Sequence, residues 1–321
     1  MNKTLSICIP TYNRKKYLKE LLDSILQYTE SMGIYVCVSD NCSPDGTGNY
    51  LKELALKRKF FSFQIQPENI GLEKNMISVI SMANTDYYLP IGDDEVISPE
   101  FFSLIDKKLD GNLDLLILDG WHVNSTLEVK INRHLPNFLH NKKYNDPFEA
   151  FTHIWDKMPL GSFVVKTECN KCDMNTYLGT SHIYTSIVWE YLSKQLMKNK
   201  KIEIECISEP VVLFRQIEKT WRSDSAQIML YEIPQWFLTL PKEYKNVTKN
   251  ILDVYLSNQA KFRYLLYYRS LGQLDNDFIN TYMTSFKKSH KNRAYIMALI
   301  PPYVAKILVN IKTFLARIIK K

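Results

Sequence analysis

The chain has 321 residues, of which 45% are apolar and 23% charged, a composition that excludes a disordered protein and allows one large α/β domain with an appendage. The net charge of +7 arises at one end, because residues 278–321 hold nine of the 41 basic residues and no acidic ones. The apolar run at 5–9 is too short for a secretory signal, so we expect a cytoplasmic protein whose six cysteines are reduced.

Strand and helix patterns alternate through the first ninety residues. We expect strands at 5–9, 35–39, 61–66 and 87–91. Helical spacing of apolar residues predicts a helix after each of the first three, and the second should begin at Pro44 with Ser43 as its N-cap. This alternation indicates right-handed crossovers and a mostly parallel central sheet flanked by helices, an α/β fold.

Polar residues follow each of these strands. Thr11, Asp40, Asn69 and Asp93 all fall at the carboxyl ends of strands, where open parallel sheets bind their ligands. The glycine-rich dinucleotide and P-loop motifs are both absent from the sequence, which argues against a dehydrogenase or a P-loop enzyme. A bound diphosphate would therefore need a metal ion and basic side chains to neutralise it.

The acidic turn Gly92-Asp93-Asp94-Glu95 could supply that metal site. Three consecutive carboxylates repel one another, so a cation is expected near them. A hard divalent ion that also holds phosphate oxygens is the natural candidate. The alternative is a solvated acidic turn without a ligand.

The motifs together resemble a known family. Ile9-Pro10-Thr11-Tyr12-Asn13-Arg14, residues 38–47, Asn69-Ile70-Gly71 and Gly92-Asp93-Asp94-Glu95 occur in the order typical of family 2 glycosyltransferases of the GT-A (Rossmann-like) fold. The chain is most similar to bacterial O-antigen and capsule enzymes of the abequosyltransferase-like group, over about residues 4–110. The resemblance implies inverting transfer of a sugar from a nucleotide-diphosphate donor, with a UDP-sugar favoured, to an acceptor hydroxyl, assisted by Mn²⁺ or Mg²⁺.

The resemblance also implies roles for single residues. The nucleotide-binding set is Pro10, Thr11, Tyr12, Arg14, Asp40, Asn69 and Asp93. Within it, Asp40 would accept a hydrogen bond from the base and Asp93 would lie near the ribose, whereas Asn69 could equally be a solvated residue at a helix start. Asp94 would be the metal ligand, with Glu95 as a possible second one. Ile91 stands where many relatives have an aspartate, so the part played by Glu95 stays open.

Transfer to a hydroxyl also needs a general base. Relatives usually supply it from a Glu-Asp pair that this chain lacks, and the nearest polar group in the corresponding stretch is His182, whose unperturbed pKa of about 6.5 suits the task. Asp173 and Glu190 are the reserve candidates, and His182 could instead be a helix-start residue. The polar stretch 122–147 is predicted to be a loop or hairpin over the site.

A basic cluster follows the strand at 211–214. Arg215, Lys219 and Arg222 match the place where related enzymes carry a loop that closes over the diphosphate, although a solvated charged turn would look the same. Beyond it, apolar and aromatic residues at helical spacing predict a helical appendage. We therefore divide the chain into a catalytic domain at 1–222 and a helical region at 223–321.

The last helix is predicted to be basic and amphipathic. Residues 303–321 place apolar residues on one face and Lys and Arg largely off it, which favours an interfacial helix on anionic lipids. A core helix or a homodimer contact is the alternative, and nucleic acid is disfavoured. We expect a peripheral enzyme on the inner face of the cell membrane that acts on a lipid-linked or cell-surface saccharide. A sugar nucleotidyltransferase and a non-catalytic saccharide-binding or scaffold subunit are kept as alternatives.

Overall fold

The computed structural model describes residues 4–109, 112–217 and 224–319, with side chains up to residue 311. The chain divides into two compact units, which are treated separately below. The first comprises Met1–Leu178 with Ile183–Ile217, and the second comprises Gly179–His182 with Glu218–Lys321. The short segment from 179 to 182 therefore leaves the first unit and returns to it.

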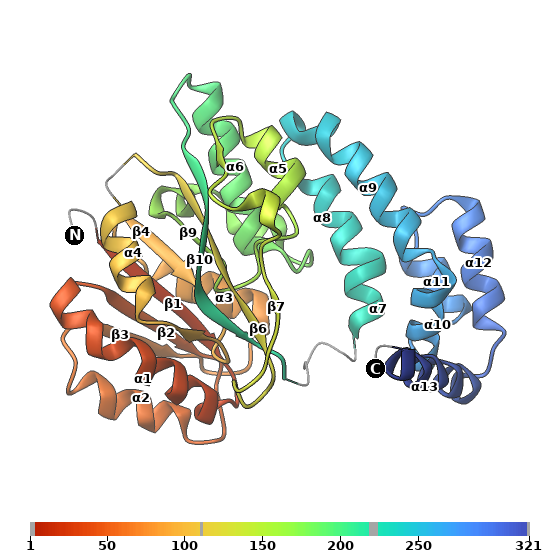
Figure 1. The fold of residues 1–321 in the computed structure, drawn as a ribbon, viewed down its shortest axis with the longest axis horizontal. Coiled ribbons are helices and arrows are strands. Elements are labelled where there is room, and N and C mark those ends of the chain that lie inside the picture. Colours follow the sequence, from red (N-terminus) through yellow and green to blue (C-terminus); the bar gives the residue numbers. More distant parts are fainter. Residues whose placement is uncertain (1–3, 110–111, 218–223, 320–321) are drawn as a thin grey trace. The chain divides into compact units, whose positions relative to one another are not determined.

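The first unit is built on a ten-stranded sheet with the order β3-β2-β1-β4-β9-β6-β10-β5, in which β7 pairs with β6 and β8 with β10 (Figure 1). The strands are β1 (Leu5–Thr11), β2 (Tyr35–Asp40), β3 (Phe61–Ile65), β4 (Tyr87–Pro90), β5 (Val96–Ile97), β6 (Leu115–Val123), β7 (Lys130–Arg133), β8 (Lys143–Tyr144), β9 (Phe163–Lys166) and β10 (Ile204–Arg215). The first four strands are parallel, as the alternation predicts. β9 then runs antiparallel to both β4 and β6, so the complete sheet is mixed.

Helices cover both faces of this sheet. They are α1 (Lys15–Met32), α2 (Thr47–Ala55), α3 (Leu72–Ser81), α4 (Glu100–Lys108), α5 (Pro147–Ile154) and α6 (Ile183–Met197), with short 3₁₀ turns η1 (Asn137–Leu139), η2 (Thr167–Lys171) and η3 (Met174–Tyr177). Helices α1 and α4 share one hydrophobic core with the strands, and Tyr28 stacks on Phe102 with ring centroids 4.0 Å apart. α3 packs against β1, β2 and α6.

The predicted start of α2 was wrong by three residues. The helix begins at Thr47 after Gly46, whose left-handed φ of 81° suits glycine. Ser43 instead accepts a hydrogen bond at Oγ from the backbone N–H of Asn13, at 2.7 Å. Asp45 likewise accepts from the backbone N–H of Lys15, at 2.8 Å. The loop after β2 therefore fastens the loop after β1, a contact between distant segments that outweighs the local capping signal.

The second unit is helical, which confirms the C-terminal helical region. Its described elements are α7 (Ser225–Gln227), a π-helical turn η5 (Ile228–Glu232), α8 (Ile233–Thr239), η6 (Lys242–Tyr244), α9 (Lys245–Gln259), α10 (Phe262–Ser270), α11 (Asn276–Tyr282), α12 (Lys288–Ala298) and α13 (Pro302–Ile319). They enclose a separate core that includes Leu256, Leu265 and Ile279. Within the described ranges, no single helix is long and apolar enough to cross a membrane.

Candidate functional site

The acidic turn follows β4, and its first carboxylate is held from two directions. Asp93 is buried and accepts a hydrogen bond at Oδ2 from the hydroxyl of Thr11, at 2.8 Å. Arg14 donates to its other oxygen at 3.2 Å. Burial raises the pKa of Asp93 to about 6, although the Arg14 guanidinium opposes that rise. Residues at the carboxyl ends of β1 and β4 therefore meet, as the sequence predicts.

Asp94 lies beside Asp93 and is more open to solvent, with 17% of its side chain exposed. The same Arg14 nitrogen lies 3.5 Å from Asp94 Oδ2, so one guanidinium bridges both carboxylates. Gly92 leaves room for this arrangement, because a Cβ there would lie 3.0 Å from Asp94 Oδ1. In the described part of the chain, no group of three or more His, Cys, Asp or Glu side chains is placed to hold a metal ion.

Arg215, at the end of β10, is joined to this acidic turn by two hydrogen bonds. Glu95 accepts a hydrogen bond from the backbone N–H of Arg215 at 2.9 Å, and Arg215 Nε donates to the carbonyl of Asp94 at 3.0 Å. The buried guanidinium also bonds the carbonyl of Ser125 and the carboxylate of Glu20.

Arg215 was predicted to contact the diphosphate, and in the structure its side chain bonds the acidic turn. Its guanidinium lies over the ring of Tyr17, 5.0 Å from the centroid, as well as bonding the turn. Arg14 is the basic side chain seen to reach the two carboxylates. Lys219 and Arg222, predicted with Arg215, lie outside the described residues.

Asp40, at the end of β2, is fully buried and only half satisfied. Its Oδ1 accepts a hydrogen bond from the backbone N–H of Ser43 at 3.2 Å, whereas Oδ2 has no hydrogen-bond partner among the described residues. Burial raises the pKa of Asp40. Gly48 lies next to the unpaired oxygen, since a Cβ there would be 3.6 Å from Oδ2 and 2.9 Å from Ile65 Cδ1. A buried carboxylate oxygen without a partner is costly, so this one is suited to a ligand N–H.

Asn69 and Asn41, which follows Asp40 at the end of β2, hold the loop before α3. Asn41 donates to Asn69 Oδ1 at 2.8 Å and accepts from the backbone N–H of Ile70 at 2.9 Å. The same Asn69 oxygen accepts from the N–H of Gly71. These contacts fix the loop that leads into α3. Tyr12, predicted to line the base and ribose, is exposed at the end of β1.

The predicted bases have different surroundings. His182 belongs to the second unit, where it stacks on Trp236 with ring centroids 4.7 Å apart, and its Nδ1 lies 3.2 Å from the carbonyl of Thr180. That contact requires the proton on Nδ1 in the neutral ring, which makes Nε2 the basic nitrogen. Burial lowers the pKa of His182 to about 4.

The reserve bases lie in the first unit and make local contacts. Asp173 accepts a hydrogen bond from the backbone N–H of Asn175 at 3.0 Å, which caps η3. Glu190 forms an ion pair with Lys194 one turn further along α6 and accepts from the hydroxyl of Tyr177 at 2.8 Å. Both carboxylates therefore already stabilise local structure.

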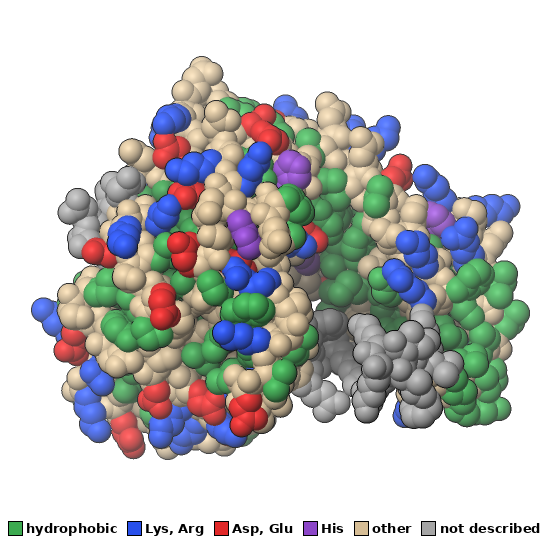
Figure 2. Space-filling model, viewed as in Figure 1, with side chains coloured by type: hydrophobic (Ala, Val, Ile, Leu, Met, Phe, Trp, Pro, Cys, Tyr) green, Lys and Arg blue, Asp and Glu red, His purple; other side chains and the backbone are tan. Residues whose placement is uncertain are grey.

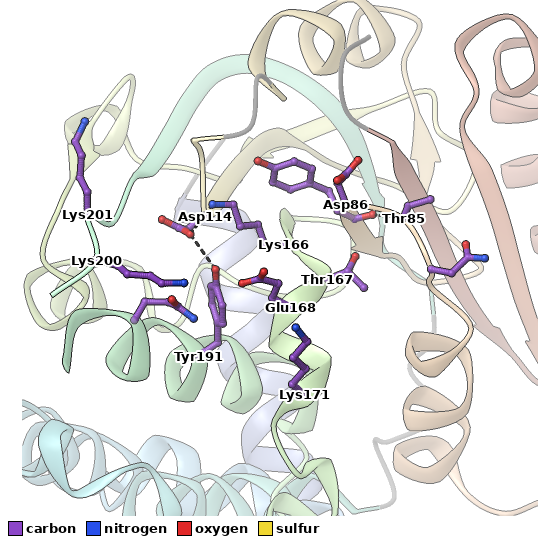
Figure 3. A pocket seen from close by; sticks show the side chains of 13 residues that line it. Thr85, Asp86, Asp114, Lys166, Thr167, Glu168, Lys171, Tyr191, Lys200 and Lys201 are labelled. Atoms are coloured by element: carbon purple, nitrogen blue, oxygen red, sulfur yellow. Dashed lines mark hydrogen bonds and ion pairs between the residues drawn. The ribbon is translucent and has the colours of Figure 1, made fainter. Parts of the chain in front are cut away.

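A second polar cluster lies at the opposite edge of the sheet, where β4 and β6 begin and β9 ends (Figure 3). It lines a pocket of about 520 Å³ that contains none of the predicted site residues. Asp114 is nearly fully buried there and accepts at Oδ1 from both Lys166 and Tyr191, each at 3.0 Å. Its Oδ2 accepts from the backbone N–H of Glu203 at 3.0 Å. Both oxygens are therefore satisfied, and this carboxylate ties α6 to the sheet.

The sheet and the site at its carboxyl edge define an α/β protein of the GT-A class. Solved structures that share the fold include Staphylococcus aureus TarS in complex with UDP-GlcNAc. It is 17% identical, with a TM-score of 0.57, and the match covers 92% of this chain and 79% of that one. Another is the mannosyltransferase PcManGT from Pyrobaculum calidifontis in complex with GDP-Man and Mn²⁺, which is 14% identical, with a TM-score of 0.50 and coverage of 93% of this chain and 88% of that one.

The sequence comparisons identify the family. Residues 6–165 match the model of glycosyl transferase family 2. The abequosyltransferase RfbV of Salmonella typhimurium is 28% identical over 232 residues, which are 66% of this chain and 66% of that protein. Residues 6–165 therefore form a glycosyl transferase family 2 domain, and the chain is similar to an abequosyltransferase. It spans just under two thirds of that relative's length.

Proposed function

We propose that this protein transfers a sugar, with inversion, from a nucleoside-diphosphate donor to a hydroxyl of a saccharide acceptor. The observation that carries the proposal is the pairing of two features at one edge of the sheet. Asp40 presents a buried, unpaired carboxylate oxygen, and Asp93 and Asp94 form an acidic turn bridged by Arg14. The first feature suits a nucleobase and the second suits the ribose and diphosphate.

The chemistry of Asp40 supports a preference among donors. An ionised carboxylate can only accept hydrogen bonds, so it selects a base that presents a ring N–H. Uracil does so at N3, whereas the N3 of cytosine is itself an acceptor. UDP-sugars are therefore favoured over CDP-sugars. The neighbouring structures agree with this class of ligand, since TarS was solved with UDP-GlcNAc and PcManGT with GDP-Man.

Asp94 is the residue that would hold Mn²⁺ or Mg²⁺, with Glu95 the less suitable second ligand because its carboxylate bonds β10. These ions are commonly held by one or two carboxylates together with phosphate oxygens of the substrate. The residues present fit such a site, in which the donor diphosphate would supply the remaining ligands. When bound, the ion would neutralise charge on the leaving diphosphate. Arg14 would add a second positive charge beside both carboxylates.

His182 is the proposed general base. The acceptor oxygen forms a bond to the anomeric carbon, the bond to the nucleoside diphosphate breaks, and the hydroxyl proton passes to the base. The contact of Nδ1 with Thr180 fixes the tautomer in which Nε2 can accept that proton. A pKa of about 4 keeps the ring neutral at physiological pH but makes it a weak base.

The acceptor is proposed to be a lipid-linked or cell-surface saccharide, and the enzyme is proposed to work on the inner face of the cell membrane. Similarity to an abequosyltransferase supports a saccharide acceptor. The basic, amphipathic segment 303–321 supports an anionic membrane surface as a partner. A homodimer is the alternative use of this segment.

The test is release of free nucleoside diphosphate from a panel of UDP-, dTDP-, GDP- and CDP-sugars with Mn²⁺ and acceptor extracts. We expect release from a UDP-sugar only when acceptor is present, with a glycosylated product. Pyrophosphate exchange with a nucleoside triphosphate would instead indicate a sugar nucleotidyltransferase. Donor binding without release from any member of the panel would indicate a non-catalytic saccharide-binding subunit.

A further inference from the structure

A continuous apolar surface lies where α12 ends and α13 begins. Six large hydrophobic side chains there are between 43% and 80% exposed: Ile296, Leu299, Tyr303, Ile307, Leu308 and Ile311. We call this set the corner surface. Figure 2 shows hydrophobic side chains gathered over this part of the second unit. Contiguous exposed hydrophobic residues on a protein surface mark a site of interaction.

The corner surface is distinct from the face of α13 that packs inside the second unit. Ala305 is fully buried, and α13 packs against α10. Tyr303, Ile307 and Ile311 follow one another at intervals of four and lie on an outer stripe of the helix. The core of the unit therefore leaves this stripe unused, which argues against α13 as an ordinary core helix.

Basic residues border the corner surface. On the outer side of α12, exposed residues change from Lys288 and Arg293 to Ile296 and Leu299 toward its end. Lys306 is exposed on α13 beside the apolar stripe. No acidic residue occurs from 278 to 321, although Lys287 pairs with Asp253 at 3.4 Å. An apolar surface with a basic border matches the interface of a bilayer that contains anionic lipids.

We propose that the corner surface inserts into the interfacial layer of an anionic lipid bilayer. Helix α12 and residues Pro302–Ile311 are bent by 98° across the break at residues 299–301, so the end of one helix and the side of the next form a single apolar corner. Membrane contact thus begins on α12, before the segment 303–321. The inference rests on the membrane partner proposed above, but it does not depend on the donor chemistry, since vesicle binding needs no turnover.

Other occupants fit less well. A second copy of the chain would bring two basic borders together, and like charges at an interface repel. A bent membrane span formed by the same two helices would place Lys306 and the break between the helices within the hydrocarbon, where a charge and backbone groups outside a helix are both costly. An anionic bilayer surface satisfies the apolar corner and the basic border together.

The test is co-sedimentation of the full chain with vesicles of phosphatidylcholine alone or with added phosphatidylglycerol. We expect binding to the anionic vesicles that weakens with salt. The double substitution Leu299→Ser with Ile307→Ser should lower the partition coefficient at least about tenfold, because two inserted side chains are lost. The matched control is Leu238→Ser with Val254→Ser on α8 and α9, where the side chains are 61% and 62% exposed in the same unit.

A second pair of substitutions separates charge from insertion. Lys288→Gln with Arg293→Gln should lower binding to anionic vesicles about tenfold and leave binding to neutral vesicles nearly unchanged. Circular dichroism melts check that each variant is folded. An equal loss in the control pair, salt-independent binding to both vesicle types, or a concentration-dependent dimer that Leu299→Ser abolishes would each overturn the proposal. Absent nucleotide release with intact vesicle binding would instead refute only the enzymatic proposal.

Discussion

Two buried carboxylates lie at opposite edges of the same sheet, and their surroundings differ. Asp114 has both oxygens bonded, by Lys166, Tyr191 and the backbone of Glu203. Asp40 has one oxygen bonded and the other buried without a partner among the described residues. Both residues are almost inaccessible to solvent, so burial alone does not distinguish them.

This difference in hydrogen bonding distinguishes a carboxylate with a structural role from one suited to bind a ligand. A buried charge whose hydrogen bonds are complete belongs to the framework, since removing it leaves partners unpaired. A buried charge with a free acceptor lowers the stability of the unliganded protein unless a ligand completes it. The edge with Asp40 also carries the acidic turn, which places the proposed donor site at the carboxyl ends of the parallel strands.

The largest expected effect is that of Asp94→Asn. Loss of the proposed metal ligand should lower metal-dependent turnover by about 10³-fold, because a diphosphate leaving group depends on electrostatic stabilisation. Nucleotide release with and without EDTA measures this. Glu95→Gln is the matched comparison and should have a much smaller effect. Full activity of Asp94→Asn in EDTA would remove the metal assignment.

Asp114→Asn should affect stability and leave catalysis intact. It breaks a buried ion pair with Lys166, which costs about 3 kcal/mol in the free energy of unfolding. Denaturant titration measures that loss, and KM for the donor should stay unchanged in the folded variant. A selective rise in KM would show that the pocket at this edge binds substrate.

His182→Ala should lower kcat by about 10²-fold and leave donor affinity largely intact, as expected for loss of a general base. Because burial lowers the pKa of His182 to about 4, its ring stays unprotonated above that pH. The kcat of the wild type should therefore show no loss from this group between about pH 5.5 and 8. Wild-type kcat in the variant would move the base to Asp173 or Glu190.

The smallest catalytic effect, about tenfold in KM, is expected for Asp40→Asn, which loses a charged hydrogen bond to the base. The amide can also donate to cytosine, so the preference for UDP- over CDP-sugars should narrow. Competition between UDP and CDP for the donor site measures this.

The stability of the Asp40→Asn variant also tests the contrast between Asp40 and Asp114. Burial raises the pKa of Asp40 in the folded protein, so the folded state binds a proton more tightly than the unfolded state does. The wild type therefore gains stability as the pH falls from above this folded-state pKa to the lower pKa of the unfolded chain. The asparagine variant lacks this contribution. Near neutral pH the variant should be at least as stable as the wild type, in contrast to Asp114→Asn. A large loss of stability would mean that Asp40 has a structural role like that of Asp114.

Much of the fold follows from local patterns. The strands β1 to β4, the helices between them and the polar residues at their ends were all predicted, and the structure joins Thr11 and Arg14 to Asp93. The stretch after β6 was predicted to be a loop or a hairpin, and the antiparallel pairing of β6 with β7 shows a hairpin. These features depend on periodicity and on the rule that parallel strands end at one edge, both of which a sequence displays.

The sequence by itself thus determined the α/β class, the order of the strand ends, the resemblance to family 2 and the basic character of the last helices. Only the tertiary structure decided which groups are satisfied. Arg215 supports the acidic turn from 121 residues away, and Ser43 fastens a loop instead of capping a helix. It also separated the unpaired oxygen of Asp40 from the satisfied Asp114. Such distinctions depend on hydrogen bonds between distant segments, which local patterns do not encode.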